Sequence, residues 1–183
     1  MKVVSIVGMA GAGKSEVARV FEEAGYVRIR FGDVTEEEIK KRGLVAGEAN
    51  ERFVRELLRK EYGMVAYAVL NLPRIEKAMA KSNVVIDGLY SWEEYTFLKE
   101  RLGDEFYIIA VCAPPRVRYT RLSERATRRL TFEEASERDQ SEIEHLNKGG
   151  PIAMADYMVL NVFTLATLRK RVREIIRELE KKD

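Results

Sequence analysis

The stretch Gly8-Met9-Ala10-Gly11-Ala12-Gly13-Lys14-Ser15, which follows the apolar run 3–7, decides the fold of this chain. It fits the phosphate-binding loop pattern G-x4-G-K-[S/T], which lies between a strand and a helix. Glycines let the backbone turn sharply and approach a triphosphate without a Cβ in the way, and the successive N–H groups form an anion pocket. Chance produces such a match in roughly one per cent or less of chains of this kind. We therefore prefer an ATP site to the alternative of a ligand-free glycine turn.

Two side chains of the stretch carry specific expectations. Lys14 is expected near the β- and γ-phosphates, and the Ser15 hydroxyl is the usual ligand of Mg²⁺. The residues predicted to contact ATP are Gly8, Gly11, Ala12, Gly13, Lys14, Ser15 and Glu16.

The bulk composition indicates one globular domain. The chain has 183 residues, of which 46% are hydrophobic and 34% charged, and its net charge is +2. A surface dense in both signs argues against nucleic acid as the main partner. The single Cys112 cannot form an internal disulfide, no apolar stretch reaches the 18 or so residues of a membrane span, and no signal peptide is expected. These features predict a cytoplasmic protein, and they leave the oligomeric state open.

Strand-like apolar runs alternate with helical patterns, which predicts a three-layer α/β domain with a five-stranded, mainly parallel sheet. Strands are expected at 3–7, 27–31, 84–87, 106–112 and 157–160. Helices are expected at 15–24, 35–42, 48–62, 64–81, 131–146 and 165–180, and a loop at 148–151. Thr35 and Thr131, each with a glutamate three residues on, predict N-caps, and Pro73 is expected to interrupt its helix. Segments 34–82 and 121–151 depart from the plain alternation.

Two aspartates follow expected strands at the edge where open α/β sheets bind ligands. Asp87 ends the strand 84–87, where a carboxylate can hold Mg²⁺ through water. Asp33 follows the second strand and could orient or deprotonate a substrate hydroxyl, or bind Mg²⁺. The structural alternative for each aspartate is to cap the helix that follows it.

Arginines crowd the segment before the last strand, and guanidinium groups can neutralise a phosphoryl group in transfer. Arg121 and Arg125 are four residues apart, which predicts one helix face. We expect two or three of these arginines to be catalytic on a mobile lid, and the rest to be surface residues paired with glutamates. The cluster contains Arg116, Arg118, Arg121, Arg125, Arg128 and Arg129.

Other polar residues are less specific. Arg52, Arg55 and Arg59 have helical spacing, and one of them is expected to bind an acceptor phosphate. His145 has no Cys or His neighbour, so a surface role is favoured over a zinc site. Tyr90, Trp92 and Tyr95 fit base stacking and core packing equally well.

With these motifs in place, the chain resembles the nucleoside monophosphate kinase group of P-loop kinases over most of its length. It is most similar to an archaeal family of adenylate-kinase-related, dephospho-CoA-kinase-like proteins. The resemblance implies a core of 1–33, 83–120 and 152–183, an acceptor-binding insert at 34–82 and a lid at 121–151. It also implies that Asp33 is the base, that Arg121, Arg125 and Arg138 are lid arginines, and that Asn161 lies near the adenine. Where adenylate kinases have an arginine after Asp87-Gly88, this chain has Tyr90-Ser91.

The leading hypothesis is therefore an ATP- and Mg²⁺-dependent kinase acting on a nucleoside monophosphate or on dephospho-CoA. A nucleotide-binding regulator with slow or no ATP hydrolysis is the main alternative. A polynucleotide-end kinase is a third, because the arginines could follow a nucleic-acid backbone. A GTPase is disfavoured because Asn147-Lys148-Gly149-Gly150 lacks the final aspartate of a guanine motif.

Overall fold

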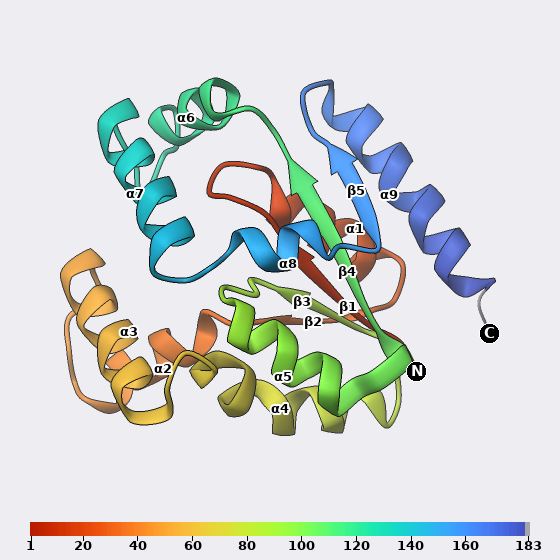
Figure 1. The fold of residues 1–183 in the computed structure, drawn as a ribbon, viewed down its shortest axis with the longest axis horizontal. Helices are drawn as coiled ribbons and strands as arrows, with labels where there is room; N and C mark the ends of the chain where they lie inside the picture. The colour runs from red at the N-terminus through yellow and green to blue at the C-terminus, as the bar shows by residue number, and fades with distance from the viewer. Residues whose placement is uncertain (182–183) are drawn as a thin grey trace.

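A five-stranded parallel sheet forms the centre of the computed structural model, which describes residues 1–181 (Figure 1). All four strand pairings are parallel and the strand order is β2-β3-β1-β4-β5. The strands are β1 (Val3–Val7), β2 (Val27–Arg30), β3 (Val84–Asp87), β4 (Phe106–Cys112) and β5 (Tyr157–Leu160). The predicted fold class is confirmed, and four of the five strands have the predicted bounds.

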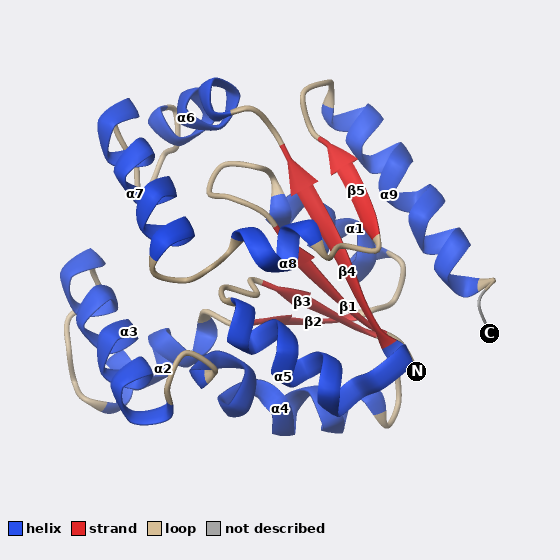
Figure 2. Ribbon diagram, in the orientation of Figure 1, coloured by secondary structure: helices blue, strands red, loops and turns tan. Residues whose placement is uncertain are grey.

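Helices cover both faces of the sheet (Figure 2). They are α1 (Lys14–Glu23), α2 (Asp33–Lys41), α3 (Glu48–Tyr62), α4 (Ala66–Met79), α5 (Trp92–Leu102), α6 (Pro115–Ser123), α7 (Phe132–Glu144), α8 (Gly149–Ala153) and α9 (Leu165–Glu180), with a short 3-10 helix η1 at Gly103–Glu105. One apolar core joins α1 and α9 to the sheet, a second joins the sheet to α2, α3, α4 and α5, and a small third cluster joins the loop after β1 to α6 and α7. Burial on both faces explains the nearly continuous apolar sequences of the inner strands β1, β3 and β4, whereas the outer strands β2 and β5 are largely exposed or half-buried.

The parallel register brings the segments that follow β1, β2 and β3 to one edge of the sheet. Asp87 pairs with Ile6 of β1 on one side and with Arg30 of β2 on the other. The phosphate-binding loop, the start of α2 and the end of β3 therefore meet there, although they are far apart in the sequence. This is the edge at which open α/β sheets bind ligands.

Several local predictions are confirmed. Thr131 and Glu134 form the expected capping box of α7. The bounds of α3 and α9 are also those predicted from the sequence.

Four local predictions are wrong. Thr35 does not cap α2: the helix begins at Asp33, and the buried Thr35 Oγ1 lies 2.6 Å from the Tyr67 hydroxyl. Pro73 does not interrupt α4, because its exposed ring lies inside a continuous helix. Segment 148–151 is not simply a loop, since α8 starts at Gly149, and Arg125 lies beyond the end of α6 rather than on its face.

Candidate functional site

The loop between β1 and α1 has the backbone that a phosphate pocket requires. Gly8, Gly11 and Gly13 have φ values of 141°, 77° and 104°, which L side chains rarely adopt. A Cβ would also collide at each position, with Val111 O at 2.3 Å, Arg118 O at 2.7 Å and Asn161 Nδ2 at 2.3 Å respectively. The loop is thus packed closely between β4, α6 and the segment after β5. At Gly8 and Gly11 the obstacle is backbone, so glycine is required there on two independent grounds, whereas at Gly13 the obstacle is the end of a side chain and the φ value is the main reason.

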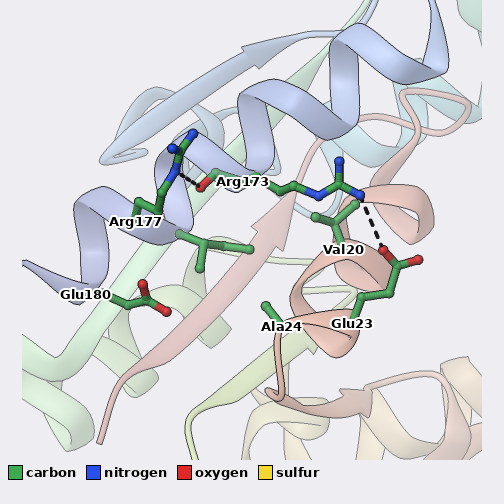
Figure 3. A pocket seen from close by; sticks show the side chains of 7 residues that line it. Val20, Glu23, Ala24, Arg173, Arg177 and Glu180 are labelled. Atoms are coloured by element: carbon green, nitrogen blue, oxygen red, sulfur yellow. Dashed lines mark hydrogen bonds and ion pairs between the residues drawn. The ribbon is translucent and has the colours of Figure 1, made fainter.

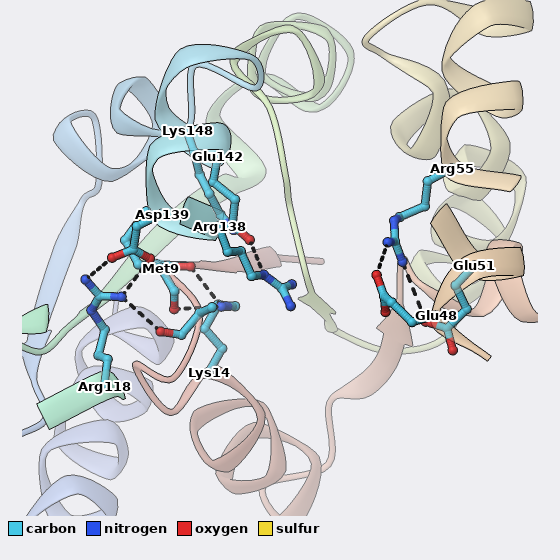
Figure 4. Close-up of polar contacts among 12 residues, drawn as sticks. Met9, Lys14, Glu48, Glu51, Arg55, Arg118, Arg138, Asp139, Glu142 and Lys148 are labelled. Carbon is cyan, nitrogen blue, oxygen red and sulfur yellow. Dashed lines mark hydrogen bonds and ion pairs between the residues drawn. The ribbon is translucent and has the colours of Figure 1, made fainter. Parts of the chain in front are cut away.

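Lys14 opens α1 and folds back over the loop. Its ammonium donates hydrogen bonds to the carbonyl oxygens of Gly8 at 2.8 Å and Met9 at 3.1 Å (Figure 4). Burial and then the positive charge of Lys148 lower the pKa of Lys14 to about 7, against the opposing influence of Glu142 and other acids. A polyphosphate bound here would favour the charged ammonium, because an anion next to a cation stabilises its protonated form.

Asp87 lies at the same edge, but it has a protein partner. Arg28 of β2 donates a hydrogen bond from Nη2 to Asp87 Oδ2 at 2.5 Å, and both side chains are mostly buried. Asp87 is not the cap of α5, since Ser91 performs that role by accepting from the Glu94 amide.

The donor set fits Mg²⁺ as it binds with a nucleotide. Ser15 is exposed in the first turn of α1, and the Asp87 carboxylate lies near the Lys14 ammonium, where its charge partly opposes the lowering of the pKa of Lys14. Within residues 1–181 no group of three or more His, Cys, Asp or Glu side chains could hold a metal by itself. Mg²⁺ does not need such a cage, because substrate phosphates and water usually complete its coordination.

Asp33 occupies the first turn of α2 rather than its cap. Its Oδ1 lies 3.2 Å from Arg30 Nη1, and its side chain is 37% exposed. Burial raises the pKa of Asp33, while Arg30 opposes that rise. A carboxylate with a raised pKa is a better proton acceptor.

Segment 121–151, the predicted lid, is anchored to the loop by a buried arginine that the sequence did not single out from its neighbours. Arg118 of α6 forms a two-pronged ion pair with Asp139 of α7, at 2.9 and 2.6 Å, and donates to Ala10 O at 3.1 Å (Figure 4). Tyr119 also donates to Asp139, at 2.9 Å. Arg118 therefore has a structural role, and a change at Asp139 would reach the phosphate-binding loop through it.

The fold does not place the side chains of the three predicted lid arginines together. Arg121 donates from Nη2 to Asn161 O at 2.9 Å, and its Nη1 is buried without a partner. Arg138 lies on α7 and donates to Glu142 at 3.1 Å. Arg125 lies in the loop after α6, where partial loss of hydration and the nearby charge of Arg138 lower the pKa of its guanidinium.

A shallow hollow of about 350 Å³ lies on α6 beside Arg121, lined by Arg116, Val117, Thr120 and Arg121. Asn161 lies next to it and donates to Ala12 O at 2.8 Å. The end of β5 is thereby tied to the phosphate-binding loop.

The three arginines of α3 have different environments. Arg52 is exposed and pairs with Glu56, and Arg55 pairs with Glu48 and Glu51 on its own helix (Figure 4). The guanidinium of Arg59 lies 5.7 Å from the centre of the Tyr67 ring, and its Nε is buried without a hydrogen-bond partner. Of these three, Arg59 is the one directed into the protein.

Two residues at the site were missed by sequence reasoning. Lys148 is 2% exposed, and its ammonium lies 2.7 Å from Glu142 Oε2. Burial alone would raise the pKa of Glu142, but the charges of Lys148 and Arg138 lower it to about 2. Nothing in the sequence distinguishes these two from the many surface Lys and Glu residues, because only the fold buries them.

A second hollow, of about 630 Å³, is unrelated to the loop (Figure 3). It lies between the carboxyl-terminal end of α1 and α9, so the length of α1 separates it from Lys14. Arg173 and Glu23 approach to 3.8 Å across it.

His145 is exposed, as predicted. None of the helices described in residues 1–181 could cross a membrane.

Comparison with known proteins gives a consistent result. The family model described as an AAA domain matches residues 4–146. The UPF0200 protein of Thermococcus onnurineus is 36% identical over 181 residues, which is 97% of each chain. Among solved structures, a gluconokinase from Sinorhizobium meliloti superposes with a TM-score of 0.61 at 14% identity and covers 98% of this chain and 94% of its own. Shikimate kinase from Bacteroides thetaiotaomicron has a TM-score of 0.63 at 14% identity, with coverage of 96% and 98%. These two likenesses show a P-loop, kinase-like fold.

Proposed function

Because the chain belongs to the UPF0200 family and has a kinase-like P-loop fold, we propose that it is an ATP-dependent phosphotransferase. It would transfer the γ-phosphoryl group of Mg-ATP to a small nucleotide-like acceptor. Its activity would then resemble that of the adenylate and dephospho-CoA kinases, as the sequence resemblance suggested.

The observation that carries the proposal is the loop between β1 and α1. Three glycines with positive φ are wedged against neighbouring backbone and side chains, and Lys14 closes over the carbonyl groups of Gly8 and Met9. Only glycine adopts these φ values without strain, and the absence of Cβ atoms leaves the successive backbone amides of the loop open to a phosphate group.

Each part of the site has a proposed role. Gly8, Gly11, Ala12 and Gly13 would bind the phosphates through backbone amides, with Lys14 between the β- and γ-phosphates. Ser15 would hold Mg²⁺ directly and Asp87 through water, and the ion would neutralise phosphate charge. Glu16 faces Arg19 and Arg169 by ion pairs, so its contact with the nucleotide would be indirect.

The nucleotide base would lie on α6, in the hollow beside Arg121, and Asn161 would position that end of the site through Ala12. Segment 121–151 would act as the lid, and Arg125 and Arg138 would approach the phosphates as it closes. Segment 34–82 would hold the acceptor, with Arg59 directed into that site. Asp33 would accept the proton of the attacking hydroxyl.

An acceptor screen tests the proposal. The protein with ATP and Mg²⁺ would be offered nucleoside monophosphates and dephospho-CoA, and also shikimate and gluconate, because the structural neighbours include a shikimate kinase and a gluconokinase. We expect one phosphorylated acceptor by mass spectrometry, and none from the Lys14→Ala variant, which should fold but lose triphosphate binding. ADP without any phosphorylated acceptor would refute the kinase assignment.

One observation favours a nucleotide-binding regulator as the second candidate. Arg28 already neutralises Asp87, the carboxylate expected to support Mg²⁺. If that ion pair persists with nucleotide bound, turnover would be slow and lid closure would be the output. In that case ATP would bind and order segment 121–151, and no acceptor would be phosphorylated.

A further inference from the structure

We propose that Lys148 is a second ammonium for the γ-phosphoryl group, and that Glu142 is the internal anion that this group displaces. This inference rests on the proposed nucleotide site and assigns it a residue outside the phosphate-binding loop. It also predicts a measurable preference for triphosphate over diphosphate.

The first observation is the position of Lys148. It follows the lid helix α7, and its backbone amide donates to Glu142 O at 3.2 Å. Its ammonium lies 5.8 Å from the centre of the Tyr90 ring. Tyr90 in turn lies against Gly88, the residue directly after Asp87. Its hydroxyl is 2.7 Å from the point where a Cβ on Gly88 would lie. Lys148 thus lies next to the end of β3.

The second observation is that Lys148 also lies near the phosphate-binding loop. In Figure 4 the side chains of Arg138, Glu142 and Lys148 extend from the lid segment towards Lys14. The two ammonium groups are close enough for the charge of Lys148 to depress the pKa of Lys14. Lys148 therefore lies between the loop that would hold ATP and the strand ends that would face the acceptor.

The third observation is the balance of charge. Lys148 and Arg138 place two positive charges on the carboxylate of Glu142, and the Lys14 ammonium lies close by. Oε2 of that carboxylate accepts from Lys148 at 2.7 Å and Oε1 accepts from Arg138 at 3.1 Å. Two further acids lie near the lysines, but Asp87 is already paired with Arg28, and burial raises the pKa of Glu94 to about 7, which favours its neutral form. A buried ammonium is costly without a counter-ion, and the carboxylate of Glu142 cannot neutralise all of these cations. The cluster is short of negative charge.

A γ-phosphoryl group supplies that missing charge. Phosphoryl transfer spreads negative charge over the moving group, and fixed cations on several sides stabilise it. Lys14 would approach from the loop, and Lys148 and Arg138 from the lid. Until the nucleotide binds, Glu142 holds Lys148 and Arg138 in place. When the nucleotide binds, its phosphoryl oxygens compete with Glu142 for these two cations.

Nucleotide binding to the full chain tests this assignment without knowledge of the acceptor. Calorimetric titrations would compare Mg²⁺ complexes of a non-hydrolysable ATP analogue and of ADP. Lys148→Met should weaken binding of the ATP analogue about tenfold and change ADP binding less than twofold. Lys148→Arg, which keeps a cation, should restore most of the difference. Lys170→Met, on an exposed lysine of α9, is the matched control and should change neither affinity.

Glu142→Gln is expected to change the affinity for the ATP analogue in the opposite direction to Lys148→Met. Removing the competing carboxylate should strengthen binding of the ATP analogue several-fold, whereas a purely structural ion pair would predict weaker binding of both nucleotides. If Lys148→Met fails to fold, the Lys148→Met/Glu142→Gln double variant removes both buried charges. Its ratio of ATP-analogue to ADP affinity should then fall below that of Glu142→Gln alone.

The outcomes separate the two proposals. If the wild-type protein binds neither nucleotide, the proposed function fails. If it binds both and no Lys148 or Glu142 variant changes the ratio of affinities, the assignment of Lys148 is overturned while the nucleotide site stands.

Discussion

Replacing Gly8 by alanine should lower both the stability of the protein and its affinity for ATP, because the position is closed to any side chain. Gly8 has a φ of 141°, and a Cβ there would lie 2.3 Å from Val111 O. Val111 belongs to β4, which is paired on both sides by β1 and β5. The carbonyl cannot retreat without disturbing the middle of the sheet, so the loop itself must move.

The magnitude follows from two terms. Holding a non-glycine residue at such a φ costs about 1–3 kcal/mol. Forcing an extra methyl group into a packed site costs about another 1–3 kcal/mol. Together they predict a loss of about 4 kcal/mol, which corresponds to a fall in Tm of about 8–16 °C in a chain of this length.

Gly43→Ala separates the two terms. Gly43 also has a positive φ, of 66°, but nothing lies within 4 Å of the point where a Cβ would be added. Only the backbone term applies there, so the loss should be about 1–2 kcal/mol. Thermal unfolding by circular dichroism and ATP titration by calorimetry would be run on both variants. If Gly8→Ala is no less stable than Gly43→Ala and binds ATP normally, the inference that close packing around Gly8 excludes a side chain is refuted.

Three further predictions concern buried charges. Asp139→Asn leaves Arg118 without its carboxylate, and loss of one partner from a buried pair should reduce the free energy of unfolding in urea by about 3–5 kcal/mol; a loss below about 1 kcal/mol would contradict the anchoring role. Burial raises the pKa of Glu94 from 4.5 to about 7, so the folded state binds the extra proton and stability falls as the pH rises from 4.5 to 7. Glu94→Gln should therefore stabilise the protein by about 3 kcal/mol at pH 8 and by little at pH 4, and equal effects at both pH values would exclude this titration. Arg28→Met frees the Asp87 carboxylate and should strengthen binding of Mg-ATP relative to metal-free ATP by about tenfold, or about 1.4 kcal/mol, in calorimetry; an unchanged ratio would remove Asp87 from the metal site.

Local signals in the chain were sufficient for most of the architecture. Buried parallel strands have nearly continuous apolar sequences, and the bounds of β1, β3 and β4 followed from them. The apolar run of β5 gave its bounds as well, although that strand is only partly buried. The capping box at Thr131 was equally visible, because a cap depends on residues within one turn. Thr35 has the same local pattern, but its hydroxyl bonds to Tyr67, 32 residues away, which no local rule detects.

The candidate site divides in the same way. The chain alone determined the phosphate-binding loop, because the chemistry of Gly8 to Ser15 depends on contiguous residues and on the strand and helix beside them. Which charges surround that loop depended on the tertiary structure: Arg28 covers Asp87, Arg118 anchors Asp139, and Lys148 is buried against Glu142. The physical reason is that an ionisable group owes its role to burial and to neighbours brought from distant parts of the chain, and these exist only once the helices have packed on the sheet.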